Sequence, residues 1–79
     1  MVLIEVEEFA KKYVESNKNE NIEDVIERLN ESLENKKSGS KCCQCGATIW
    51  ALGSAVSGFE GCFTCITGEA DDSSDYEVF

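Results

Sequence analysis

The chain has 79 residues, in which seven Lys and Arg stand against sixteen Asp and Glu, so its formal net charge is −9. This sign argues against nucleic acid and anionic membrane surfaces as partners, because both select for Lys and Arg. The sequence has no His, and it therefore lacks the usual general base near neutral pH and the commonest nitrogen ligand for metals.

We expect no secretory signal peptide, because the first residues contain no basic segment followed by an apolar run. No stretch approaches the roughly eighteen consecutive apolar residues of a transmembrane helix. The five cysteines are an odd number, which prevents a full set of internal disulfides. We therefore expect a cytoplasmic protein, in which the thiols stay reduced.

Residues 1–37 are predicted to form two amphipathic helices, because apolar residues recur there at spacings of three and four. The first stripe is Leu3, Val6, Phe9, Ala10, Tyr13 and Val14. The second stripe is Ile22, Val25, Ile26, Leu29 and Leu33. Asn21 is a predicted N-cap, and Lys36 and Lys37 followed by Gly39 indicate a helix end. The short connection favours an antiparallel helical hairpin, with both stripes in the core or with one face open for a partner helix or for homo-oligomerisation.

Residues 38–79 carry the cysteines in the pattern Cys-x2-Cys-x16-Cys-x2-Cys, a spacing typical of structural zinc sites. The predicted metal ligands are Cys42, Cys45, Cys62 and Cys65. Two residues between the cysteines of a pair let one tight turn direct both sulfurs at a single ion, and Gly46 suits a backbone with positive φ. Cys43 is left over, since Cys43 with Cys45 would make a poorer chelate. We expect it to be a small buried residue, and a redox-sensitive thiol is the alternative.

Because of these two cysteine pairs, the segment 42–65 resembles the zinc-ribbon and rubredoxin-like group. It departs from that group at Ile66, where a glycine often follows the last cysteine. The resemblance implies two cysteine turns joined by a β-hairpin. We expect its outgoing strand in residues 47–52 and its return in residues 55–59, with a bend at Gly53. Trp50, Phe59 and Phe63 would then cover the metal and pack against the helices.

Zinc is the favoured ion, and iron in a rubredoxin-like site is the alternative, because the same four sulfurs bind both. Four thiolates close the coordination shell, so the predicted zinc is structural rather than catalytic. The sequence also has no nucleophile with an adjacent base and no phosphate-binding loop, and we predict that the chain is not an enzyme.

The C-terminal tail is acidic and is expected to be disordered by default, although residues 76–79 alternate apolar and polar and could add a short strand. All seven Lys and Arg precede Cys42, and six acids follow it without any basic residue. Such an acidic surface favours association with basic proteins.

The sequence thus predicts a small metal-stabilised α+β protein. Its parts are a helical hairpin in residues 1–37 and a four-cysteine zinc module with an acidic tail in residues 38–79, either separate or packed as one domain. The favoured function is a non-enzymatic protein–protein interaction module, such as an adaptor, inhibitor or antitoxin- or immunity-type protein for a basic partner. The alternative is a small iron electron-transfer protein.

Overall fold

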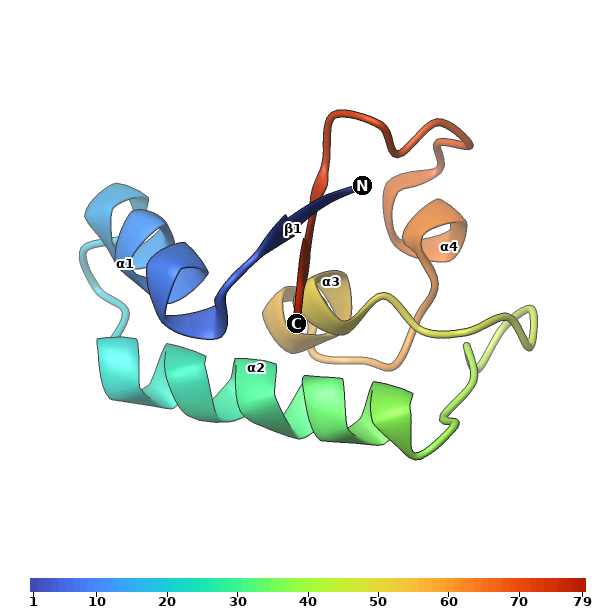
Figure 1. Cartoon of the computed structure of the whole chain (residues 1–79), viewed down its shortest axis with the longest axis horizontal. Helices are drawn as coiled ribbons and strands as arrows, with labels where there is room; N and C mark the ends of the chain where they lie inside the picture. Colours follow the sequence, from blue (N-terminus) through green and yellow to red (C-terminus); the bar gives the residue numbers. More distant parts are fainter.

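The computed structural model describes residues 1–79 as a small α+β protein (Figure 1). Its helices are α1 (Val6–Ser16), α2 (Ile22–Lys37), α3 (Ala51–Ser57) and α4 (Phe63–Thr67). Its strands are β1 (Val2–Ile4) and β2 (Tyr76–Val78), at opposite ends of the chain. The expectation of a small α+β fold is confirmed in this general form, but several of its elements differ from the prediction.

The two amphipathic helices of the N-terminal part are present as α1 and α2, and they contact each other. Asn21 caps α2 as predicted, because its side-chain oxygen accepts hydrogen bonds from Glu23 N at 2.8 Å and Asp24 N at 3.4 Å. The expected antiparallel helical hairpin is not confirmed. The apolar stripe of α2 packs more extensively against α3 than against α1, so α2 serves as the central helix of the fold rather than as half of a hairpin.

The sheet is parallel and joins the two ends of the chain, which corrects the prediction of an antiparallel β-hairpin. β1 pairs with β2 in the register Val2↔Tyr76, Leu3↔Glu77 and Ile4↔Val78. Leu3 therefore lies in a strand and not in the first helix, and the tail ends in the short strand considered as the alternative to disorder. Local sequence periodicity does not reveal this pairing, because the partners are separated by almost the whole chain.

The β-hairpin expected between the cysteine pairs is absent, and helix α3 takes its place. Within the predicted strands, only Thr48 forms a β-bridge, an isolated antiparallel one to Lys41 outside them. Gly53, predicted to bend the chain, lies inside α3 against the Trp50 ring, and a Cβ atom at this position would overlap that ring. The small residues of this segment thus allow the helix to lie close to the Trp50 indole. A strand prediction based on residue propensities does not take such a contact into account.

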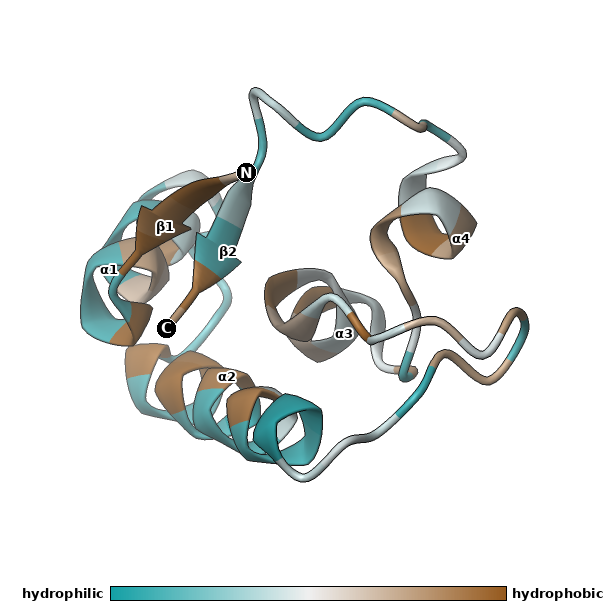
Figure 2. Ribbon diagram, turned by 45° about the vertical axis from the view of Figure 1, so that its right-hand side comes forward, coloured by the Kyte–Doolittle hydropathy of each residue, from teal (hydrophilic) through white to brown (hydrophobic).

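A single cluster of buried apolar side chains includes residues from both halves of the sequence. Its members are Ile4, Ala10, Val25, Leu29, Trp50, Ala51, Leu52, Ala55, Phe63 and Val78. Figure 2 shows the apolar side of α2 turned toward the rest of the fold and its polar side turned away. The core therefore fixes α3, and the cysteine turns on either side of it, against the longest helix.

Candidate metal centre

The first cysteine pair lies on a tight turn between Lys41 and Thr48. Cys42 N donates to Ala47 O, and Gly46 N donates to Cys42 O at 3.0 Å, which closes the turn around the two sulfurs. Gly46 has φ of 78°, a left-handed conformation that side chains other than glycine rarely adopt. The predicted role of this glycine is confirmed.

The second pair lies at the start of α4 rather than on a second turn of the same kind. Cys62 is the N-cap of this helix, and its sulfur accepts a hydrogen bond from Cys65 N at 3.4 Å. A helical turn needs no left-handed residue directly after its second cysteine, which explains why Ile66 is accommodated there. The glycine with positive φ comes later, at Gly68, where α4 ends.

Two backbone contacts bring the second pair next to the first. Cys43 N donates to Glu60 O at 3.1 Å, and Trp50 N donates to Gly61 O at 2.8 Å. Because Glu60 and Gly61 directly precede Cys62, these bonds hold the start of α4 beside the first cysteine turn.

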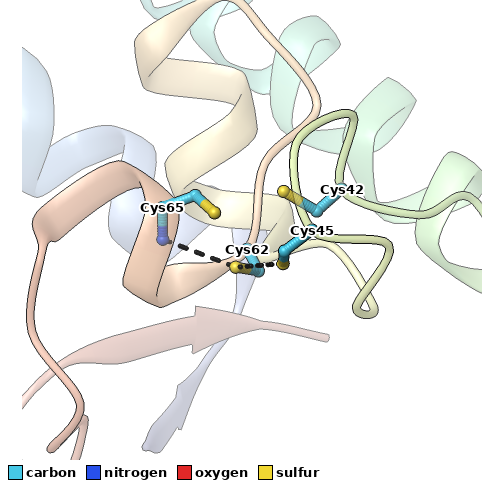
Figure 3. A group of neighbouring side chains, drawn as sticks. All are labelled: Cys42, Cys45, Cys62 and Cys65. Atoms are coloured by element: carbon cyan, nitrogen blue, oxygen red, sulfur yellow. Dashed lines mark hydrogen bonds between the residues drawn. The ribbon is translucent and has the colours of Figure 1, made fainter.

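The structure brings all four predicted ligands together (Figure 3). The four sulfur atoms lie within 4.8 Å of one another, and Cys45 Sγ is 3.4 Å from Cys62 Sγ. A tetrahedral zinc site with Zn–S bonds of about 2.3 Å places its sulfurs about 3.8 Å apart. The observed separations bracket this value, so the cluster fits a single metal ion with small side-chain adjustments.

Backbone amides around the cluster favour thiolates on one residue of each pair. Hydrogen bonds from the amides of Cys45 and Gln44 lower the pKa of Cys42 to about 6. The amide of Cys65 likewise lowers the pKa of Cys62.

The pKa values of the other two thiols, Cys45 and Cys65, are raised by the neighbouring cysteine side chains. The pKa of Cys65 is raised, first by the thiol of Cys62 and then by those of Cys42 and Cys45. For Cys45 the amide of Ala47 favours the thiolate, but the neighbouring sulfurs of Cys62 and Cys42 raise its pKa overall. Without a cation the four thiols cannot all be deprotonated, because neighbouring thiolates repel one another. A divalent ion would offset this repulsion.

Two of the three aromatic residues expected near the metal are buried beside the site. Trp50 and Phe63 pack edge to face with ring centroids 5.0 Å apart, and the Trp50 indole donates to Tyr76 O at 2.9 Å. Phe59 is 38% exposed, so it does not share this role. Cys43 is exposed as well, in contrast to the buried position expected for it, and its sulfur is not part of the cluster.

Glu77, which was not among the predicted site residues, supports the site with its buried carboxylate. It accepts hydrogen bonds from Ala51 N and Leu52 N, both at 2.9 Å, and from Lys36 Nζ at 2.8 Å. Glu77 therefore caps the N-terminus of α3 from the far end of the chain. Its sequence context, an acidic tail, gives no signal of this role; only the alternation of residues 76–79 hints that Glu77 belongs to a strand.

Comparison with known proteins finds no family model, no curated protein and no solved structure that matches this chain. None of the helices has both the length and the apolar character needed to span a membrane.

Proposed function

We propose that the chain is a non-enzymatic protein-binding module whose fold is stabilised by a structural zinc ion on Cys42, Cys45, Cys62 and Cys65. The observation that carries the metal assignment is the convergence of the four sulfurs within 4.8 Å. Four thiolates complete the coordination of zinc and leave no position for a substrate or for an activated water. A reducing compartment such as the cytoplasm would keep these thiols available, and that location remains a prediction.

The size of the protein gives the ion a clear physical role. Zinc bound by small modules contributes on the order of 10 kcal/mol to folding. Here the ion would join the turn at Cys42 to the start of α4 at Cys62, two segments that α3 separates in sequence. The metal would therefore fix the position of α3 from both of its ends.

The expected partner is a protein with a basic surface. The residues after Cys42 contain no Lys or Arg, and Glu60, Glu69 and Asp71 are exposed in this region. Among the seven basic side chains, Arg28 and Lys36 are already engaged in ion pairs with Glu20 and Glu77. A surface with this imbalance attracts cationic proteins and accelerates their association.

Two measurements test this function. A partner recovered with the zinc-loaded protein should bind more weakly as the salt concentration rises, because salt screens the attraction between exposed charges. Binding that does not respond to salt would contradict the electrostatic basis of the proposal. Elemental analysis of the same sample identifies the ion: zinc is expected, and a red iron-loaded protein would instead support the electron-transfer alternative.

A further inference from the structure

The two edges of the β1–β2 sheet differ in what covers them. On β2, the outward-facing carbonyl of Tyr76 accepts the hydrogen bond of Trp50 Nε1 at 2.9 Å. The outward-facing amide of Val78 donates to the Glu77 carboxylate at 3.0 Å. Helix α3 also packs against β2. The β2 edge is therefore closed to any further strand.

The β1 edge is open. Val2 N donates across the sheet to Asp75 O at 2.8 Å, so by the alternation of a parallel ladder the N–H and C=O of Leu3 point away from β2. No third strand follows β1, and Leu3 is 65% exposed while Val2 is 50% exposed. An edge with free backbone groups and exposed apolar side chains is a template for pairing with another strand.

The surroundings of this edge are acidic and apolar. Tyr76 and Phe79 add exposed apolar surface on and beside β2. The exposed acids that directly follow β1 are Glu5, Glu7 and Glu8. The acids of the segment before β2 are Glu69, Asp71, Asp72 and Asp75; the Met1 ammonium pairs with Asp72 at 3.5 Å, and no Lys or Arg occurs in residues 1–10 or 42–79.

We propose that the β1 edge binds an extended segment of the partner protein, in which apolar residues alternate with Lys or Arg. The added strand would hydrogen-bond to Leu3, and its cations would face the acids that flank β1. A second copy of this chain fits less well, because its own net charge is −9 and the same acids surround its strand. The inference rests on the proposed function, and it specifies where on the molecule the basic partner binds.

The probe for the test is a capped peptide of alternating lysine and valine, added to the zinc-loaded full chain. We expect the Leu3 amide to shift in NMR spectra and its hydrogen exchange to slow on binding, because that amide becomes a strand donor. A glutamate–valine peptide should bind at least roughly tenfold more weakly, since charge complementarity is reversed. A lysine–valine peptide with N-methylated amides keeps the charge but loses its backbone donors, and it should bind weakly too.

A matched pair of variants isolates the backbone contact. Leu3→Pro removes the N–H at the open edge and spares the ladder bond of Val2, whereas Leu3→Thr loses the same side chain but keeps the N–H. We expect the proline variant to bind the peptide roughly tenfold more weakly than the threonine variant. If the proline variant does not fold, hydrogen exchange at Leu3 in the unaltered chain decides the question alone.

Several results would overturn the inference. These are no binding of the lysine–valine peptide, equal binding by both variants, or amide shifts confined to residues outside β1. A dimer whose Leu3 amide is protected without peptide would assign the edge to a second copy instead. The metal content of each sample is measured in parallel, so that loss of the proposed zinc site is distinguished from failure of this docking surface.

Discussion

Glu77→Gln perturbs the fold through a single buried carboxylate, and its effect follows from the hydrogen bonds of each oxygen. Oε1 accepts from Leu52 N and Val78 N, and Oε2 accepts from Ala51 N and Lys36 Nζ. Glutamine keeps one acceptor oxygen and replaces the other with an NH2 group. At least one buried donor must then face another donor, whichever way the amide is turned.

The expected loss of stability is about 3 kcal/mol. A buried backbone amide left without an acceptor costs about 1–3 kcal/mol, and the remaining bonds lose the strengthening that a charged acceptor provides. The Lys36 ion pair adds at most about 1 kcal/mol, because that side chain is 33% exposed. For a domain of this size the melting temperature should fall by about 10–25 °C.

The assay is urea and thermal unfolding of the zinc-loaded protein, followed by the fluorescence of its single tryptophan, Trp50. Glu69→Gln is the matched control, because it removes the same charge from an exposed position and should change stability by less than about 0.5 kcal/mol. The reasoning would be refuted if Glu77→Gln matched this control. A more stable Glu77→Gln protein would indicate that repulsion within the acidic chain outweighs the capping of α3.

The cysteines, the close contact in α3 and the acid sensitivity of the site give three further predictions. Cys62→Ser should yield metal-free, unfolded protein by elemental analysis and circular dichroism, whereas Cys43→Ser should keep the metal because the Cys43 sulfur lies outside the cluster. Gly53→Ala should lower the free energy of unfolding by about 1–3 kcal/mol, because its Cβ overlaps the Trp50 ring, and Ser57→Ala is the exposed control in the same helix. Metal binding requires four deprotonated thiols, so a chelating dye should detect metal release as the pH falls; the raised pKa values of Cys45 and Cys65 make these two ligands the first to be protonated.

Local features of the chain were largely predictable from sequence. Asn21 as the cap of α2 and Gly46 in the first cysteine turn depend on interactions within a few residues, and the structure confirms both. The grouping of the cysteines was predictable for a similar reason, because the Cys-x2-Cys spacing places both sulfurs of each pair on one turn.

Features that depend on distant partners were not predictable in the same way. Val2–Ile4 continues the apolar pattern of the first helix, and only its pairing with Tyr76–Val78 makes it a strand. The segment after Ile49 has strand-forming residues, but α3 receives its N-terminal cap from Glu77 and its close contact from Gly53. The likeness to a zinc ribbon therefore gave the cysteine cluster correctly and the connection between its two halves incorrectly.

Native mass spectrometry of the full chain, purified without added metal, tests the zinc site most directly. We predict the mass of the polypeptide plus one zinc ion, with loss of that ion when the protein is denatured in acid. Addition of a chelator should then unfold the protein, because the ion joins the turn at Cys42 to the start of α4 at Cys62. A chain that carries no metal and still gives the circular dichroism spectrum and cooperative unfolding of a folded protein would contradict the proposed structural zinc.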